Sequence, residues 1–220
     1  CAGSAITRTE HVTGWFAQAV ADADRCRGET VLAFDIGGTK TFAALVRGDT
    51  VLDRRLAPTP PDVGSSGWFD AIADMAGDWR GQYHVAGVAA TGLVRDGLWN
   101  ALNPGTLAIP PDTPLSGELA RRLNCPIVSR NDAQAAAWGE YQFGAGQQRD
   151  MAFVTVSSGI GGGIVLGGRL VEGARGLAGS LGQVQGSEGD LRLEDLASGF
   201  AMAATAGEAG LPADTRLLFD

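Results

Sequence analysis

Residues 31–58 read VLAFDIGGTKTFAALVRGDTVLDRRLAP, and this stretch decides the fold class. It contains three short runs of strand character, VLAFDIGG, TFAALVRG and TVLDRRLAP, each bounded by glycine or by a polar turn. Three consecutive strands with such short connections predict a meander.

The rest of the chain alternates between helical and strand patterns. Helices are expected over 9–26, 68–79, 116–123 and 133–143, and a linker over 24–30. Strands are expected over 84–94 and 126–133, a hairpin through Arg95-Asp96-Gly97, and a pair of strands joined through glycines within 151–171. The order βββαβα, followed by a second set of strands, predicts an α/β fold with a mixed sheet.

Composition excludes several classes of function. The chain has 220 residues, enough for one large or two small domains, and a net charge of -8 without a cluster of Lys or Arg. Such a charge balance disfavours a nucleic-acid partner. No apolar run of about 18 residues and no basic leader are present, which predicts a cytoplasmic protein without a membrane partner. The three widely spaced cysteines suggest reduced thiols.

The first glycine cluster, Asp35 to Lys40, follows the first strand. Glycine lets backbone amides approach an anion closely, Thr39 adds a hydroxyl, and Asp35 could hold a hydrated Mg²⁺ beside phosphates. A tight hairpin explains Gly-Gly equally well. The phosphate hypothesis assigns these cofactor-binding residues: Asp35, Gly37, Gly38, Thr39 and Lys40.

A second glycine cluster, SSGIGGG, spans residues 157–163. Glycines weaken a strand unless another backbone or a ligand comes close, and the spacing does not fit a dinucleotide fingerprint. Two anion-suited turns in one chain favour a divided phosphate clamp. The candidate residues here are Ser158, Gly159, Gly161 and Gly162.

Asn131 and Asp132 lie between the two clusters, where a strand leads into a helix. In isolation, Asp132 is explained most simply as a helix N-cap. The functional alternative is a general base that accepts a hydroxyl proton during phosphoryl transfer, with Asn131 orienting the acceptor. Asn103, before Pro104, is either a turn residue or a partner for sugar hydroxyls.

In this order and spacing, these stretches resemble the ROK family of sugar kinases and repressors. The matching segments lie between about Val31 and at least Ala204 and read FDIGGTK, ATGLVRDG, ALNP, NDAQAAAWGE, VTVSSGIGGGIVLGGRLVEGARGLAG and LEDLASG. The resemblance implies an actin-like (ribonuclease-H-like) ATPase fold. Its two lobes would cover residues 28–130 and 131–220, the second being incomplete.

Roles follow from the resemblance residue by residue. It makes Asp132 the catalytic base toward a sugar 6-hydroxyl and places Asn103, Asn131 and Glu194 in the sugar site. It implies ATP and Mg²⁺ as cofactors, with the two glycine clusters at the phosphates. The later segment that holds adenosine in relatives is absent, so we expect an inactive fragment of a longer kinase.

The chain departs from the family pattern at Gly179-Ser180-Leu181-Gly182-Gln183, where relatives usually read G-E-x-G-H. The histidine is a sugar contact and usually a zinc ligand, and the cysteine-rich segment that follows it in relatives is missing. We therefore expect Ser180 and Gln183 in the sugar site and no zinc. Without zinc, the loop 186–191 needs other contacts or is mobile.

Within the family, ALNP followed by NDAQAAAW is most similar to bacterial N-acetylmannosamine kinases. The expected reaction is ATP-dependent phosphorylation of N-acetylmannosamine, as in sialic acid and amino sugar catabolism. The alternatives are a glucokinase- or fructokinase-type hexokinase and a catalytically impaired sugar-binding or regulatory protein. Sugar and ATP are the expected partners, and a homodimer is a further expectation from the family.

The first twenty residues, CAGSAITRTEHVTGWFAQAV, resemble another family. They are similar to the carboxyl end of N-acetylmannosamine-6-phosphate 2-epimerases, which are TIM barrels that commonly bind phosphate after strands seven and eight. An accidental match of a helical leader is the alternative. The resemblance predicts that residues 1–27 are the last strand and helix of a barrel, plus a linker.

Overall fold

The structure, a computed structural model, describes residues 29–48, 50–104, 107–186 and 191–211. The chain divides into two units, unit 1 up to Asp132 and unit 2 from Ala133 onward. The expected helix over 9–26, the expected linker up to residue 28 and the barrel remnant over 1–27 lie outside the described residues. The linker was expected to extend to residue 30, but Thr30 already belongs to the first strand.

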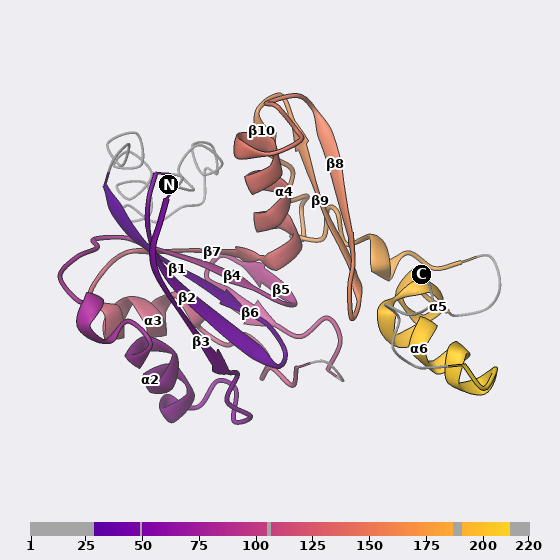
Figure 1. The fold of residues 1–220 in the computed structure, drawn as a ribbon, viewed down its shortest axis with the longest axis horizontal. Coiled ribbons are helices and arrows are strands. Elements are labelled where there is room, and N and C mark those ends of the chain that lie inside the picture. The colour runs from indigo at the N-terminus through magenta and orange to yellow at the C-terminus, as the bar shows by residue number, and fades with distance from the viewer. Residues whose placement is uncertain (1–28, 49, 105–106, 187–190, 212–220) are drawn as a thin grey trace. The chain divides into compact units, whose positions relative to one another are not determined.

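The meander expected from residues 31–58 is confirmed. β1 (Thr30–Ile36) pairs antiparallel with β2 (Lys40–Arg47), and β2 pairs antiparallel with β3 (Thr50–Pro58). β4 (Ala86–Ala90) and β7 (Ile127–Asn131) add parallel to β1. The five strands form one mixed sheet in the order β3-β2-β1-β4-β7 (Figure 1).

Two helices, α2 (Ser66–Asp74) and α3 (Leu115–Leu123), lie on the same side of this sheet (Figure 1). The helix expected over 68–79 is shorter and begins earlier. It begins at Ser66 because the Ser65 side chain accepts a hydrogen bond from the Trp68 amide at 3.0 Å. Gly77, at φ +42°, then turns the chain into the 3-10 helix η2 (Gly77–Trp79).

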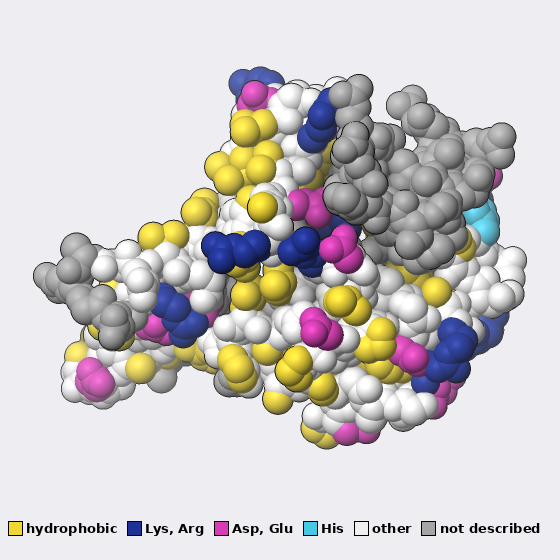
Figure 2. All heavy atoms as spheres, turned by 180° about the vertical axis from the view of Figure 1, so that it is seen from behind, with side chains coloured by type: hydrophobic (Ala, Val, Ile, Leu, Met, Phe, Trp, Pro, Cys, Tyr) yellow, Lys and Arg dark blue, Asp and Glu magenta, His cyan; other side chains and the backbone are white. Residues whose placement is uncertain are grey.

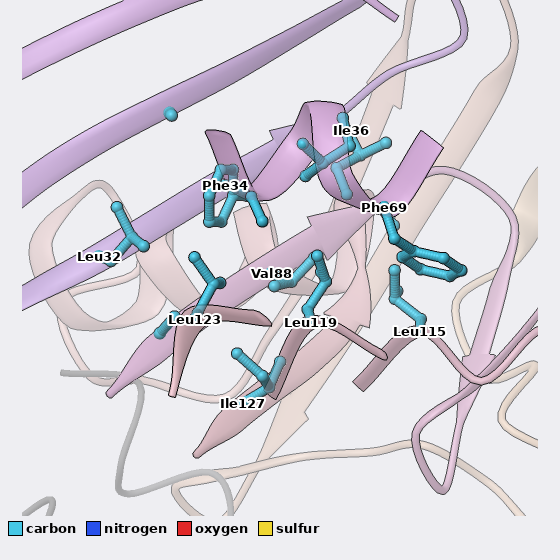
Figure 3. Packing of buried hydrophobic residues seen from close by; sticks show 14 of the residues in the cluster. Leu32, Phe34, Ile36, Phe69, Val88, Leu115, Leu119, Leu123 and Ile127 are labelled. Carbon is cyan, nitrogen blue, oxygen red and sulfur yellow. The ribbon is translucent and has the colours of Figure 1, made fainter. Parts of the chain in front are cut away.

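The core of unit 1 fills the space between the sheet and these helices. Every second residue of β1 is buried, as the alternation along a strand requires. Full burial of each large side chain contributes about 1.5–3 kcal/mol. Figure 3 shows how side chains from β1, β4 and β7 point toward those of α2 and α3: Leu32, Phe34, Ile36, Val88, Ile127, Phe69, Leu115, Leu119 and Leu123.

Arg122 ties the two helices together at the edge of this core. Its side chain, 8% exposed, donates to Asp70 Oδ1 at 2.5 Å and pairs with Glu118 one turn earlier on α3. It also donates to the Ser66 carbonyl at 3.2 Å and to the Ser66 hydroxyl at 2.9 Å. One guanidinium therefore holds the start of α2 against the end of α3.

The strand expected over 84–94 is divided in the structure. β4 ends at Ala90, and β5 (Leu93–Arg95) then pairs with β6 (Leu98–Asn100) in the expected hairpin. The division follows from Gly92, whose φ is +96°. Only glycine adopts that backbone conformation readily, so the chain changes direction there.

Unit 2 begins within α4 (Asp132–Phe143) and contains a three-stranded antiparallel sheet. Its strands are β8 (Met151–Val156), β9 (Ile160–Leu166) and β10 (Arg169–Leu170), in the order β10-β9-β8. The 3-10 helix η3 (Leu181–Gln183) and the helices α5 (Leu193–Ala197) and α6 (Gly199–Glu208) follow. In the part of the chain that the structure describes, no helix is long and apolar enough to span a membrane.

Candidate functional site

The residues expected to carry catalysis lie at one edge of the unit 1 sheet. β1, β4 and β7 run parallel, so their carboxyl ends meet at the same edge. The register aligns Ile36, Ala90 and Asn131 across the three strands. Asp35 directly precedes this row and Asp132 directly follows it. In open α/β sheets, ligands bind outside the carboxyl ends of such strands.

Asn131 is held in one orientation by two acceptors. Its Nδ2 donates to the Gly92 carbonyl at 2.8 Å and to Asp132 Oδ1 at 2.9 Å. Both acceptors are oxygens, so the amide nitrogen must face them. The Gly92 carbonyl can face Asn131 because the chain turns at Gly92. Only glycine fits at this position, because a Cβ on residue 92 would lie 2.6 Å from the Asn100 carbonyl oxygen. The sequence singled out Asn131 and Asp132 but not Gly92.

Asp35 is electrostatically linked to Asp132. Partial burial raises the pKa of the Asp35 carboxyl, and the negative charge of Asp132 raises it further. The side chain nevertheless keeps contact with solvent. The structure thus brings together two of the predicted site residues, and the like charges disfavour ionisation of Asp35 in the absence of a cation.

The first glycine cluster forms the turn between β1 and β2, so the hairpin interpretation of Gly-Gly holds. The Gly37 amide donates to the Lys40 carbonyl at 3.0 Å and is therefore already engaged. Thr59, directly after β3, fixes the turn, because its hydroxyl donates to the Gly37 carbonyl at 2.8 Å and its amide to the Thr39 carbonyl at 3.0 Å. Gly38 and Thr39 occupy the turn, and Lys40 is exposed at the start of β2.

Asn103 lies half-buried in the loop between β6 and α3. Its backbone carbonyl accepts a long hydrogen bond from the Leu107 amide at 3.4 Å. Both interpretations of Asn103, as a turn residue and as a partner for sugar hydroxyls, stay predictions.

In unit 2, Glu194 contacts the turn between β8 and β9. Its Oε2 accepts a hydrogen bond from the Ile160 amide at 3.2 Å. A Cβ at Gly159 would lie 2.5 Å from the same oxygen, so only glycine lets the carboxylate approach this closely. The structure thereby joins Glu194 with Gly159, two predicted site residues 35 positions apart. Ser158 is exposed in the same turn.

Gln183 adds a second polar contact to Glu194. Its Nε2 donates to Glu194 Oε1 at 3.4 Å, and its Oε1 accepts from Arg192 Nη1 at 3.1 Å. Ser180 precedes η3, and its carbonyl accepts from the Gln183 amide at 3.0 Å. Three residues expected to contact a sugar, Ser180, Gln183 and Glu194, therefore belong to one connected group in unit 2.

Arg192 is the member of this group that sequence reasoning missed. It is the N-cap of α5, and its guanidinium donates to Asp195 Oδ2 at 2.9 Å and Oδ1 at 2.7 Å. These bonds and the bond from the Arg192 amide lower the pKa of Asp195 to about 2. The spacing of Arg192 and Asp195, a cap residue followed three positions later by a carboxylate, was a local signal for their own contact but not for the contact of Arg192 with Gln183.

The loop 186–191 was expected either to need contacts other than zinc or to be mobile, and its described ends have backbone contacts. Gln185 forms an isolated antiparallel bridge with Arg192, and the Gly186 amide donates to the Leu191 carbonyl at 3.0 Å. Backbone contacts therefore join the two described ends of the loop.

The second glycine cluster differs from its expected position. Gly161 and Gly162 lie inside β9 rather than between strands, and close packing requires that they have no side chain. A Cβ at Gly161 would lie 2.8 Å from the Ala133 Cβ, and one at Gly162 would lie 2.6 Å from the Phe153 carbonyl oxygen. The glycines allow α4 and the neighbouring backbone to approach β9 closely.

Among the described residues, no group of three or more His, Cys, Asp or Glu side chains is placed to hold a metal ion. On the face seen in Figure 2, basic and acidic side chains are interspersed. Cys125 is a free, buried thiol, and burial raises its pKa to about 11. The expected absences of zinc and of a nucleic-acid partner stay predictions.

Comparisons with known proteins show which family the chain belongs to. A family model described as ROK family matches residues 31–219. The chain is 59% identical over 219 residues to a bifunctional enzyme NanE/NanK from Brucella melitensis, covering 99% of this chain and 42% of that relative. It is 42% identical over 199 residues to an N-acetylmannosamine kinase from Shigella boydii, covering 86% of this chain and 68% of that relative.

The fold is also similar to solved structures. A ROK family glucokinase from Streptomyces griseus, crystallised with glucose and AMPPNP, superposes with a TM-score of 0.69 and 34% identity. The match covers 81% of this chain and 60% of the glucokinase. This chain thus spans less than half of the bifunctional relative and less than two thirds of the glucokinase.

Proposed function

Because this chain belongs to the ROK family, we propose that it supplies the catalytic and sugar-binding residues of an ATP-dependent kinase for N-acetylmannosamine. The sugar assignment is supported by the names of two relatives, an N-acetylmannosamine kinase at 42% identity and a bifunctional NanE/NanK at 59%. The reaction would join the γ-phosphoryl group of ATP to the sugar 6-hydroxyl and release ADP.

One observation carries the proposal: the Asn131–Asp132 pair at the carboxyl edge of the unit 1 sheet. Asn131 donates to one Asp132 oxygen at 2.9 Å and is itself fixed by the Gly92 carbonyl. A carboxylate oriented in this way is suited to accept the proton of a hydroxyl as that oxygen attacks phosphorus. The protein contributes to phosphoryl transfer mainly by positioning the reacting groups, and the Asn131–Asp132 pair would position the carboxylate beside the attacking hydroxyl.

The turn between β1 and β2 would contact phosphate. The Gly37 amide is engaged by the Lys40 carbonyl, so we assign the phosphate contacts to the Gly38 and Thr39 amides and the Thr39 hydroxyl. The Lys40 ammonium would add a positive charge. In unit 2, the corresponding assignments are Ser158, Gly159, Gly161 and Gly162.

Asp35 fits a hydrated Mg²⁺ at this edge. Burial and the charge of Asp132 both disfavour the ionised Asp35 carboxylate, and a bound divalent cation would stabilise this carboxylate. Carboxylate oxygen is a preferred ligand of Mg²⁺, which usually keeps several waters. When bound, the ion would neutralise charge on the ATP phosphates.

Sugar contacts are proposed for Asn103 and Asn131 in unit 1 and for Ser180, Gln183 and Glu194 in unit 2. Amides and carboxylates suit this role because they can donate to or accept from several hydroxyls at once. Gln183 stands where the family usually has histidine, and it can still hydrogen-bond a hydroxyl.

A glucose-type hexokinase is the second candidate, favoured by the 34% identity to the glucokinase crystallised with glucose and AMPPNP. A coupled assay of ADP release by the full-length protein separates the two, with N-acetylmannosamine, N-acetylglucosamine, glucose and fructose as substrates. We expect the highest kcat/KM with N-acetylmannosamine. Turnover of glucose or fructose without turnover of N-acetylmannosamine would overturn the sugar assignment. Sugar binding without turnover of any substrate would favour an impaired binding protein.

Residues 1–27 are proposed to be the end of an epimerase barrel fused ahead of the kinase. The support is the alignment with the bifunctional relative, which covers 99% of this chain. Removing residues 1–27 is then expected to leave the unfolding transition of the kinase part unchanged. A large drop in its melting temperature would contradict the assignment.

A further inference from the structure

Arg192 is fixed by three hydrogen bonds to a single carboxylate. Its amide donates to Asp195 Oδ2 at 3.0 Å, its Nε to the same oxygen at 2.9 Å, and its Nη2 to Oδ1 at 2.7 Å. Two parallel bonds between a guanidinium and a carboxylate define the plane of the guanidinium. The direction of the remaining nitrogen, Nη1, is therefore set by Asp195.

That nitrogen donates to Gln183 Oε1 at 3.1 Å. A guanidinium only donates hydrogen bonds, so the Gln183 oxygen must face Arg192 and the amide nitrogen must face the other way. Nε2 then points to Glu194 Oε1, 3.4 Å away. This last contact is longer than the bond from Arg192 and is therefore the weakest in the series.

Glu194 is in turn held from the opposite side. Its Oε2 accepts from the Ile160 amide at 3.2 Å, directly after the β8–β9 turn. The contacts thus form one series, Asp195 to Arg192 to Gln183 to Glu194 to Ile160. Arg192 and Asp195 are each about one third exposed, and the lowered pKa of Asp195 keeps their ion pair formed through the neutral range.

We propose that Arg192 is a positioning residue for sugar binding, which sets the amide orientation of Gln183 and through it the carboxylate of Glu194. The inference rests on the proposed function, because it assumes that Gln183 and Glu194 contact the sugar. The Asp195 bonds cap α5 and are structural, whereas the Nη1 bond to Gln183 serves the site.

Arg192→Lys separates these two roles. A single ammonium can pair with Asp195 and retain the charge, but it lacks the planar fork that reaches Asp195 and Gln183 together. We expect the melting temperature of Arg192→Lys to stay near that of the wild type. The KM for the sugar should rise about tenfold, since a hydrogen bond to a charged group is lost, while the KM for ATP stays within about twofold.

The test measures kcat, both KM values and sugar affinity by calorimetry, in the full-length protein. Gln183→Met removes the amide and should raise the sugar KM by a similar factor. Because the two residues act in one series, Arg192→Lys added to Gln183→Met should change the KM by no more than about twofold. Arg169→Ala, at an exposed position on β10, is the matched control and should leave every value unchanged.

Each outcome decides the inference. A wild-type sugar KM in Arg192→Lys, or effects that multiply in the double variant, would overturn it and leave the proposed kinase function intact. Equal changes in the KM for sugar and ATP with a lower melting temperature would mean that Arg192 is only structural. If the wild type prefers glucose, a raised KM for glucose in Arg192→Lys supports the inference and a wild-type KM overturns it. If the wild type binds no sugar, both the proposed function and this inference fail.

Discussion

Gly163 gives the most direct test of how α4 packs on β9. A Cβ at this position would lie 2.5 Å from the Ala137 Cβ and 3.1 Å from the Gln134 Cα. Carbon atoms in contact are normally about 3.5–4.0 Å apart, so Gly163→Ala forces the helix and strand apart by about 1 Å. Overpacking of this kind costs about 1–3 kcal/mol, a substantial part of a total stability of about 5–15 kcal/mol.

The assay is urea unfolding followed by circular dichroism. Gly139→Ala is the matched control, because it lies in α4 and a Cβ there meets nothing within 4 Å. Alanine in a helix interior should raise the free energy of unfolding by about 0.5–1 kcal/mol. Ala137→Gly should partly rescue Gly163→Ala, because it removes the closest contact.

The reasoning is refuted if Gly163→Ala unfolds at the same free energy as the wild type. Unchanged stability combined with loss of ATP binding would show that this glycine serves a ligand rather than helix packing.

Two further variants probe unit 1. Arg122→Ala should lower the free energy of unfolding by about 1–2 kcal/mol, because several hydrogen bonds between α2 and α3 are lost. Arg121 is exposed, so Arg121→Ala should change the free energy of unfolding by no more than about 0.5 kcal/mol. Equal effects of the two substitutions in urea unfolding would contradict the role of Arg122. Burial and then Asp132 raise the pKa of Asp35, so the folded state binds this proton more tightly and loses stability as pH rises through the raised pKa. Without Mg²⁺, Asp35→Asn should therefore have a higher free energy of unfolding than the wild type at neutral pH. This difference should disappear below the ordinary pKa range of a carboxyl group. An equal difference at both pH values would contradict the raised pKa of Asp35.

The sequence was sufficient for the features that local patterns determine. The alternation of residues 31–58 predicted three strands, and the family expected from the motifs is confirmed by the match over residues 31–219. Asn131 and Asp132 were identified because a polar pair between a predicted strand and a predicted helix can be recognised from the sequence alone. Their hydrogen bond agrees with that prediction of position, and their catalytic role stays a proposal.

Features that depend on distant neighbours were not predictable in this way. Nothing local distinguishes Gly92, which reverses the chain and presents a carbonyl to Asn131, from a glycine inside a strand. The glycines of β9 were interpreted as a turn because their helical neighbours, Ala133 and Ala137, are far away in sequence. Arg192 was missed because its partner Gln183 lies nine residues earlier, across a loop.

The central claim is that Asp132 acts as the general base, and Asp132→Asn tests it most directly. The amide has nearly the same shape, and its oxygen can still accept the bond from Asn131, but it cannot take up a proton. We predict that kcat for N-acetylmannosamine falls by about 10²–10⁴-fold while the sugar affinity from calorimetry stays within about threefold. Turnover at the wild-type rate would contradict the account.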